Sequence, residues 1–413
     1  MTVFEQGKNA KGTLTFMSQV TTEQKNNALN AIADALEKNV DVIIAANKND
    51  LTEGKENGLN DGLLDRLMLN EERIKGIADG VRQVALLDDP CGKIISDYKK
   101  NNGLEIKKIT VPIGVIGIIF EARPNVTVDA AALCLKSSNS VLLRGGKEAI
   151  NSNTALSKIM RDAVESVGFP RDVIQLVHDV SRQSANDMMN MNEYLDCLIP
   201  RGGKGLIKAV VNNSTVPVIE TGSGNCHIFV DESADINMAA EIIFNAKTQR
   251  ISVCNACESL VIHSKIIDKA LPVIAKKLKE KDVEIRGDER ACAACSLVSP
   301  ATEEDFYTEY LDYIISVKTV DSLDEAIEHI NRCSTGHSEA IITNNDENAD
   351  KFLKCIDSSS VYVNASTRFT DGGEFGLGAE IGISTQKLHA RGPMGLEQLT
   401  STKYLIYGNG QVR

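Results

Sequence analysis

The chain has 413 residues, which is long for a single hydrophobic core, so two or three domains are expected. Hydrophobic residues make up 42% and charged residues 25%, a normal balance for a globular protein. A net charge of −12, only 4% aromatic residues and no tryptophan disfavour a nucleic-acid partner.

The N-terminal segment "MTVFEQGKNAKGTLTF" has no apolar run behind a basic start, so a signal peptide is not expected. The longest apolar stretch, "VPIGVIGIIF", is about half as long as a membrane-spanning helix. Ten cysteines without an export signal favour reduced thiols in a reducing compartment. We therefore expect a cytoplasmic protein with no membrane partner.

Helices are predicted through the first ninety residues. Thr21 and Gln24 form a T-x-x-Q capping box before the helical pattern of residues 26–39. Residues 40–51 and 71–87 continue at helical spacing, and the Gly- and Asn-rich residues 54–62 predict a loop.

From Ser96 the pattern changes to strands. Alternating residues on both sides of Asn102-Gly103 predict a hairpin, and the β-branched run 111–120 predicts a strand buried on both faces. Strand and helix patterns then alternate as far as Asp231, which predicts a parallel, doubly wound sheet.

The turns "LRGGK" and "IPRGGKG" follow two of these strands and come just before helices. Backbone N–H groups and a lysine at a helix start suit phosphate, whereas glycine also serves ordinary tight turns, so both interpretations stay open. Neither turn matches G-x-G-x-x-G or the P-loop pattern.

A second alternating segment begins at about Asp235 and predicts a second α/β domain. Its elements are the helix 236–249, the strand 259–263, the helix 265–281, the strand 313–320, the helix 322–333, and the strands 339–343 and 360–365. The last predicted strand is "TSTKYLIYG".

The segment "RISVCNACES" contains a C-x-x-C pair, and "CAAC" at Cys292 and Cys295 is another. Two such pairs could form a zinc ribbon, but a whole strand and a long helix are expected between them. A redox pair needs its first cysteine at a helix start after a strand, whereas a strand follows this motif. We expect core positions for Cys91, Cys134, Cys197, Cys226, Cys257, Cys333 and Cys355, and core or loop positions for Cys292 and Cys295.

Cys254 differs because it follows the cationic stretch "KTQRISV" at a loop between a helix and a strand. Nearby positive charge, such as that of Lys247 or Arg250, would stabilise its thiolate, and a thiolate forms thioesters without a metal. Cys254 is therefore the candidate nucleophile.

An ordered series of segments over nearly the whole chain resembles the aldehyde dehydrogenase superfamily. The series is "PIGVIGII", "SSNSVLLRGG", "VIETGSGN", "RISVCNACE", "EYLDYIISVKTV", "VYVNA" and "EFGLG". The resemblance implies an aldehyde-dehydrogenase-like α/β fold with two doubly wound domains and a small β oligomerisation arm. It implies a nucleotide-binding domain (1–94 and 112–232), a catalytic domain (233–370) and an arm (95–111 and 385–413) in a homo-oligomer.

The resemblance also implies roles for individual residues, carried over by position. Cys254-Asn255-Ala256 matches the family's C-x-A, so Cys254 carries the acyl group. Arg144, Arg201, Gly202, Gly203 and Glu309 fall on positions that bind the cofactor. Glu220 falls on the position of a water-activating glutamate, a role that a reductase would not need. The family's oxyanion-binding asparagine is replaced by "EARPN", in which Asn125 and Arg123 are both candidates.

Five further segments resemble those superfamily members that reduce an acyl phosphate: "FEARPNVTVD", "LRGGKEA", "ETGSGNCH", "NAKTQRISVCNA" and "KLHARGPMGLEQLTSTKY". The resemblance implies NADPH-dependent reduction of L-glutamyl 5-phosphate to glutamate 5-semialdehyde, the second step of proline biosynthesis. The upstream glutamate kinase is then an expected partner. The leaving phosphate needs cations, for which Arg123, Lys247, Arg250 and Arg391 are candidates. The alternatives are an NAD-dependent aldehyde dehydrogenase of the same fold and a zinc-binding module.

Overall fold

The computed structural model describes residues 1–413, apart from the side chain of Asp61, and the chain divides into two compact units. Unit 1 comprises Met1–Thr221, Gly376–Gly382 and Met394–Arg413, and unit 2 comprises Gly222–Phe375 and Ile383–Pro393. The division after Thr221 differs from the boundary expected after residue 232. It comes earlier because the strand Cys226–Val230 hydrogen-bonds to strands of unit 2.

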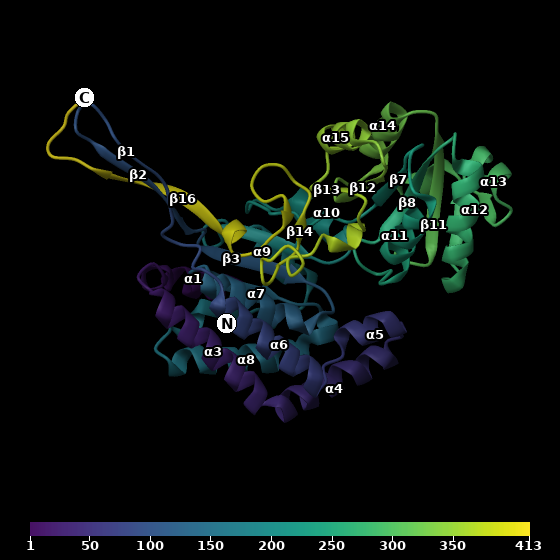
Figure 1. Ribbon diagram of the computed structural model, residues 1–413. Coiled ribbons are helices and arrows are strands. Elements are labelled where there is room, and N and C mark those ends of the chain that lie inside the picture. The colour runs from purple at the N-terminus through teal and green to yellow at the C-terminus, as the bar shows by residue number, and fades with distance from the viewer. The chain divides into compact units, whose positions relative to one another are not determined.

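The helices of unit 1 begin at the N-terminus, as the sequence predicts (Figure 1). They are α1 (Val3–Gly12), α2 (Leu14–Met17), α3 (Thr22–Lys38), α4 (Val40–Glu56), α5 (Asp61–Leu67), α6 (Glu71–Leu86), α7 (Pro124–Lys136), α8 (Ile150–Ser166), α9 (Arg182–Met189) and α10 (Lys204–Asn213), with the 3-10 turns η1 (Lys147–Ala149), η2 (Arg171–Val173) and η6 (Glu397–Leu399). The predicted capping box of α3 is present, since the Thr21 hydroxyl accepts from the Gln24 N–H and the Gln24 side chain accepts from the Thr21 N–H.

The sheet of unit 1 is parallel, with the strand order β5-β4-β3-β6. Its strands are β3 (Val115–Phe120), β4 (Ser140–Arg144), β5 (Ile174–Leu176) and β6 (Cys197–Arg201). Every residue of β3 is buried, as predicted for a central strand with helices on both faces. One face packs a hydrophobic cluster with α1, α9 and α10, and α7 contacts the sheet as well. The carboxyl ends of β3, β4 and β6 therefore meet at one edge, where this sheet type binds ligands.

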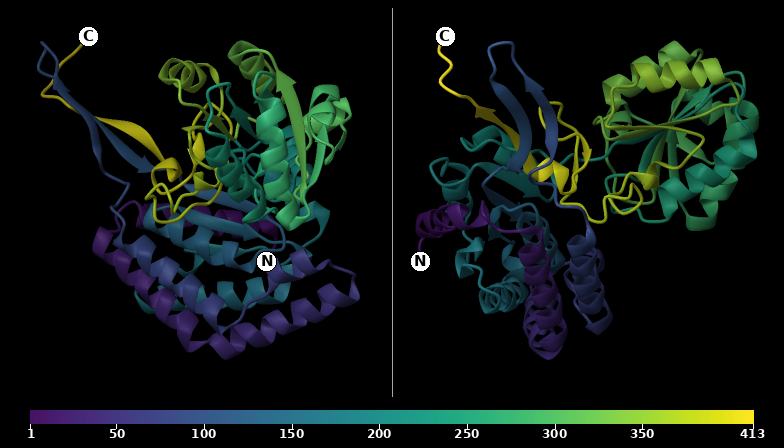
Figure 2. Two further views of the ribbon diagram at one scale, coloured as in Figure 1. Left: turned by 45° about the vertical axis from the view of Figure 1, so that its right-hand side comes forward. Right: turned by 60° about the vertical axis from the view of Figure 1, so that its left-hand side comes forward.

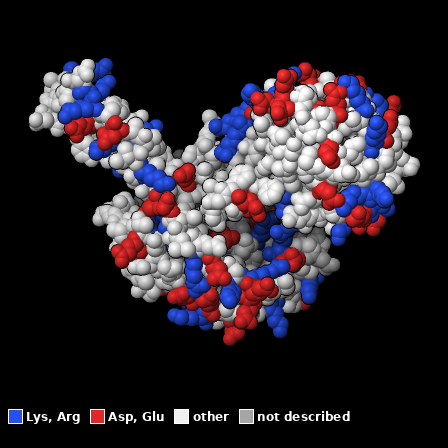
Figure 3. Space-filling view, viewed as in Figure 1, with Lys and Arg blue, Asp and Glu red and all other residues white. Residues whose placement is uncertain are grey.

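An antiparallel three-stranded arm also belongs to unit 1. It consists of β1 (Ile94–Lys99), β2 (Glu105–Pro112) and β16 (Thr400–Tyr407), in the order β1-β2-β16. The predicted hairpin is confirmed: Lys99 pairs with Glu105, and Gly103 has a φ of +91°, which glycine adopts without strain. The arm projects as a twisted ribbon (Figures 1 and 2), and acidic and basic side chains alternate along it (Figure 3).

Unit 2 is a seven-stranded parallel sheet with the order β10-β9-β11-β8-β7-β12-β13 and helices on both faces. Its strands are β7 (Cys226–Val230), β8 (Cys257–His263), β9 (Glu284–Gly287), β10 (Val298–Pro300), β11 (Ile314–Val320), β12 (Ser338–Ile342) and β13 (Ser360–Val363), beside the short antiparallel pair β14 (Ile383–Ser384) and β15 (Gly392–Pro393). Its helices are α11 (Ile236–Thr248), α12 (Ile267–Leu278), α13 (Glu289–Ala294), α14 (Leu323–Cys333) and α15 (Asp346–Cys355), with the 3-10 turns η3 (Lys279–Lys281), η4 (Glu303–Tyr307) and η5 (Thr367–Phe369).

Alternate residues of β7 and β8 enter two separate hydrophobic clusters. Ile228 and Leu260 join α11 and α12 in one cluster, whereas Phe229 and Val261 join α14 and α15 in the other. The second domain is thus doubly wound, as predicted. Among the described residues, no helix is both long and apolar enough to cross a bilayer.

Candidate active site

The residues predicted for catalysis and cofactor binding divide between the units. Cys254 and Glu309 lie in unit 2, and the others lie in unit 1, namely Asn125, Arg144, Arg201, Gly202, Gly203 and Glu220. Cys254 is half-buried in the turn between α11 and β8, the helix-to-strand loop predicted for it. Cys257, three residues on, is fully buried and begins β8. The two cysteines therefore have different environments, and burial raises the pKa of Cys257 far above its usual value.

The segment before β7 packs against the backbone of Cys254. A Cβ atom on Gly224 would stand 1.4 Å from the carbonyl oxygen of Cys254 and 2.8 Å from its Cα, so only glycine fits there. The Gly224 N–H donates to Glu309 Oε1 at 2.8 Å, and the buried Cys226 thiol donates to the Cys254 carbonyl at 3.1 Å. Glu309, implied by the resemblance to bind cofactor, thus fixes the segment that supports the candidate nucleophile.

Asn255, directly after Cys254, fixes the other side of the turn. Its Nδ2 donates to the carbonyl oxygens of Arg368 (3.3 Å) and Thr370 (2.9 Å), and its own carbonyl accepts from the Thr367 hydroxyl at 2.8 Å. The Arg368 guanidinium also donates hydrogen bonds in this region. Its Nη1 donates to Asn255 Oδ1, and its Nε donates to Gln249 Oε1 at 3.0 Å. The sequence interpretation missed Arg368, which follows Asn255 by more than a hundred residues.

The charges near Cys254 differ from those expected. Lys247 is fully buried and forms a salt bridge of 2.5 Å with Glu258, so its role as a cation for the thiolate or for phosphate was wrongly predicted. Burial raises the pKa of Glu258 to about 7, against the opposing charge of Lys247. Arg250 is exposed, and Arg391 pairs with Asp357 at 2.7 Å.

Most of the remaining cysteines lie where core packing was expected. Cys134, Cys197, Cys226, Cys295 and Cys333 are buried, whereas Cys91 and Cys292 are half-buried. Cys355 is exposed at the end of α15, so its expected core position was wrong: it is the last residue of its helix. In the part of the chain that the structure describes, no cluster of three or more His, Cys, Asp or Glu side chains is arranged to hold a metal ion.

In unit 1, the cofactor candidates lie at the carboxyl ends of the parallel strands. Arg144 ends β4, and its Nη2 donates to the carbonyls of Val180 (2.7 Å) and Ser181 (2.9 Å), just before α9. Its Nε is buried without a hydrogen-bond partner, and burial lowers its pKa. A polar ligand at this edge would satisfy that orphaned donor.

The second candidate lies where β6 leads into α10. Arg201 ends the strand, Gly203 caps the helix, and a Cβ on Gly202 would stand 2.5 Å from Glu121 Oε2. Glu121 directly follows β3, and its carboxylate accepts the Gly203 N–H at 2.8 Å. An acidic side chain thus occupies the position at the helix N-terminus that suits a phosphate.

The oxyanion candidates also lie in unit 1. Asn125 lies in the first turn of α7, and its Nδ2 donates to Asp129 Oδ2 at 2.9 Å. Burial raises the pKa of Asp129 to about 6, against the Asn125 hydrogen bond and the charge of Arg201. Arg123 immediately precedes the helix, and Glu220 is half-buried just after the bridge between Leu198 and Val218.

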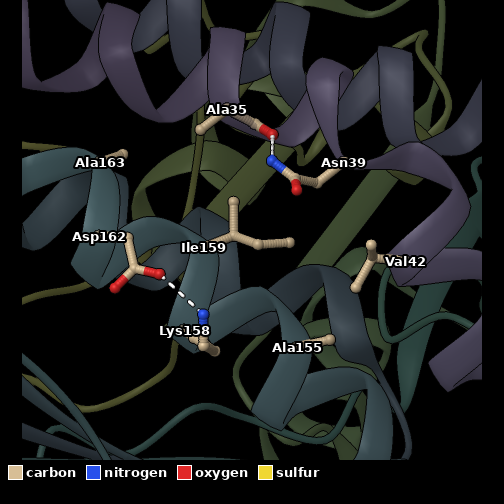
Figure 4. Close-up of a pocket in the computed structure, with 8 residues that line it drawn as sticks. All are labelled: Ala35, Asn39, Val42, Ala155, Lys158, Ile159, Asp162 and Ala163. Atoms are coloured by element: carbon tan, nitrogen blue, oxygen red, sulfur yellow. Dashed lines mark hydrogen bonds and ion pairs between the residues drawn. The ribbon is translucent and has the colours of Figure 1, made fainter.

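A pocket of about 410 Å³ opens elsewhere in unit 1, between α3, α4 and α8 (Figure 4). Of the residues that line it, Lys158 and Asp162 are charged, and they pair with each other at 3.0 Å; Figure 4 marks this pair with a dashed line. None of the predicted site residues lines it, so the pocket adds nothing to the chemistry.

Comparison with known proteins identifies the family of the chain. The model of the aldehyde dehydrogenase family matches residues 3–310 and 306–405, so the chain belongs to that family. An acetylating aldehyde dehydrogenase from Geobacillus thermoglucosidasius is 17% identical over 100% of this chain and 97% of its own, with a TM-score of 0.72, and shares the fold.

Particular relatives carry one enzyme's name. The protein of Clostridium novyi (strain NT), named gamma-glutamyl phosphate reductase, is 59% identical over 100% of this chain and 99% of its own. That of Carboxydothermus hydrogenoformans, with the same name, is 57% identical over the same shares. The crystal structure of gamma-glutamyl phosphate reductase from Thermotoga maritima is 48% identical, covers 100% of both chains and has a TM-score of 0.98.

Proposed function

We propose that the protein reduces L-glutamyl 5-phosphate to L-glutamate 5-semialdehyde and phosphate, using NADPH, in the second step of proline biosynthesis. The observation that carries the proposal is the Cys254 turn, held by Gly224 on one side and by Asn255 on the other. Relatives at 57% to 59% identity over the whole chain are named for this substrate.

Cys254 acts as the nucleophile in this proposal. Its sulfur forms a bond to the acyl carbon of the substrate while the bond from that carbon to the phosphate oxygen breaks, and the electron pair leaves with the phosphate. The product is a thioester on Cys254, and hydride from a bound cofactor would add to its carbonyl carbon and leave a hemithioacetal anion on the sulfur. Collapse of that anion breaks the carbon–sulfur bond, releases the aldehyde and restores the thiolate. Asn125 is the proposed donor to the oxyanion, with Arg123 as the alternative.

Unit 1 offers groups that fit a nicotinamide dinucleotide, which supplies the hydride when bound. Arg144 carries an orphaned buried donor, and the glycines at 202 and 203 bring bare backbone to the N-terminus of α10. Arg144, Arg201, Gly202 and Gly203 are therefore proposed to hold the cofactor in unit 1, and Glu309 in unit 2. Glu220 keeps its proposed place at the catalytic site without activating water, because hydrolysis of the thioester would make an acid.

The domain roles follow from this assignment. Unit 1 binds the nucleotide, unit 2 carries the nucleophile, and the arm joins subunits of a homo-oligomer. The proposed setting is the cytoplasm, where the upstream glutamate kinase supplies the unstable acyl phosphate.

The experiment uses the reverse reaction. Glutamate 5-semialdehyde and NADP should yield NADPH only when phosphate is present, and Cys254→Ser should lower the rate at least about 1,000-fold. Cys355→Ser, at the exposed cysteine, is the matched control and should keep the wild-type rate. Oxidation that proceeds equally fast without phosphate would instead identify an aldehyde dehydrogenase that makes acids. A wild-type rate in Cys254→Ser would disprove the nucleophile assignment.

A further inference from the structure

Arg368 has an unusual setting for an arginine of this chain. It lies half-buried in η5, and its guanidinium donates hydrogen bonds to the neutral amide oxygens of Asn255 and Gln249. Within the part of the chain that the structure describes, no carboxylate oxygen lies within salt-bridge distance of it. A half-buried guanidinium without a salt-bridge partner is costly unless a ligand supplies one.

The surroundings place this charge beside the nucleophile. Asn255, which follows Cys254 directly, both accepts from the Arg368 guanidinium and donates to the Arg368 carbonyl, so the two residues are locked together. Burial lowers the pKa of Arg368, the nearby Arg250 lowers it further, and Asp371 and Cys254 raise it. Because the charges of Arg250 and Cys254 both act on Arg368, the two cations Arg250 and Arg368 lie near the turn that holds Cys254.

We propose that Arg368 binds the phosphoryl group of the acyl phosphate beside Cys254 and stabilises the departing phosphate. A guanidinium presents a planar fork of N–H donors that matches phosphate oxygens, and Asn255 and Gln249 hold that fork before the substrate arrives. This inference rests on the proposed function, since it names the group that receives the leaving phosphate. It assigns to Arg368 the role for which Lys247 was wrongly predicted.

Phosphate protection tests the proposal without turnover. The rate at which neutral iodoacetamide alkylates Cys254 is followed by mass spectrometry of its peptide, with inorganic phosphate as the probe. In the wild type, phosphate should slow alkylation in a saturable way. In Arg368→Gln, the phosphate concentration for half-protection should rise about tenfold or more, because the charge and the fork are lost. Arg368→Lys keeps the positive charge but loses the fork of donors, so the phosphate concentration for half-protection should rise less than in Arg368→Gln.

Arg290→Gln is the matched control, since Arg290 lies in the same unit and pairs with Asp321 at 2.7 Å. It should be protected by phosphate like the wild type. Equal protection of Arg368→Gln and wild type, or no protection of the wild type, would overturn the proposal. A shift only in the pH profile of alkylation, with phosphate protection intact, would also overturn it, because Arg368 would then act on the thiolate alone.

The same experiment separates this inference from the proposed function. Phosphate protection that depends on Arg368, in a protein without phosphate-dependent NADP reduction, would contradict the proposed reaction and support the phosphate site. If Arg368→Gln does not fold, Arg368→Lys decides: unchanged half-protection in that variant would overturn the proposal.

Discussion

Gly224 packs directly against the main chain of Cys254: a Cβ atom at position 224 would stand 1.4 Å from the carbonyl oxygen of Cys254. The backbone of one residue thus sets the position of the other. Since the Gly224 N–H is bound by Glu309 and the Cys226 thiol donates to the same Cys254 carbonyl, the turn cannot shift alone.

Gly224→Ala is therefore expected to displace Cys254, the proposed nucleophile. We expect kcat for phosphate-dependent NADP reduction to fall about 100-fold, because a displacement of about 1 Å is enough to misplace a reacting group. Overpacking should also lower the free energy of unfolding by about 1–3 kcal/mol. Gly76→Ala, in α6 with no atom within 4 Å of its new Cβ, should keep the activity and gain slightly in stability. An unaffected kcat in Gly224→Ala would show that the turn adapts.

Glu121→Gln should strengthen cofactor binding. The Glu121 carboxylate accepts the Gly203 N–H at the start of α10, and a dinucleotide phosphate at that position would have to displace it. Removing the negative charge should lower the Kd of NADPH about two- to fivefold, the size of one charge at a helix N-terminus. Fluorescence titration measures this, with the exposed Glu193→Gln as the control. Weaker binding in Glu121→Gln would mean that the carboxylate assists the cofactor.

The buried Lys247–Glu258 pair predicts a pH effect on stability. Burial raises the pKa of Glu258 in the folded protein to about 7, from an ordinary value of 4.5. The folded state then holds its proton more tightly than the unfolded state, so this carboxyl's contribution to stability is full below pH 4.5 and is lost as the pH rises through 7.

Glu258→Gln resembles the protonated acid at every pH, so its free energy of unfolding should not fall as the pH rises through 7. The free energy of unfolding of the wild type, relative to Glu258→Gln, should fall by on the order of 3 kcal/mol between pH 4.5 and pH 8. Urea unfolding at several pH values measures the difference, and Glu280→Gln, at an exposed residue, is the control. Parallel pH curves for wild type and Glu258→Gln would refute the raised pKa.

The arm predicts a change of oligomeric state. Tyr404 and Ile406 lie two residues apart on one face of β16, and their side chains are 57% and 61% exposed. Other apolar residues of the arm are exposed as well, namely Ile94, Ile95, Tyr98 and Tyr407. If the arm joins subunits, Tyr404→Asp with Ile406→Asp should lower the molar mass measured by light scattering, because two charges would be buried at the interface. Lys403→Glu should leave it unchanged, and an unaltered mass in the double variant would place the interface elsewhere.

Local signals in the sequence predicted much of the fold. The Asn102-Gly103 turn fixed the hairpin, and the unbroken β-branched run predicted the buried strand β3. The boundary between the units could not be derived in the same way. A strand such as β7 has the same pattern in either sheet, and only its pairing with β8 and β12 assigns it to unit 2.

The parts of the candidate site that lie in a local sequence motif could be predicted. The parts whose side-chain contacts depend on packing between distant segments were missed. The helix-to-strand loop that holds Cys254 was predicted from its neighbours along the chain, and the structure confirms that loop. Lys247 was misjudged because sequence proximity to Cys254 gave no sign that its side chain turns inward to Glu258. Arg368 was missed because its lock with Asn255 joins two loops far apart in the chain. No periodicity or spacing signals such a contact.

The arm is completed late, which has a consequence for synthesis on the ribosome. The hairpin of β1 and β2 is complete at Pro112, but its third strand, β16, begins only at Thr400. At about 5–20 residues per second, the free edge of β2 waits roughly 15 to 60 seconds for its partner. During that interval, a neighbouring nascent chain can offer the same strand. The lysines at positions 99, 100, 107, 108 and 403 give the arm a charged surface that disfavours such premature pairing.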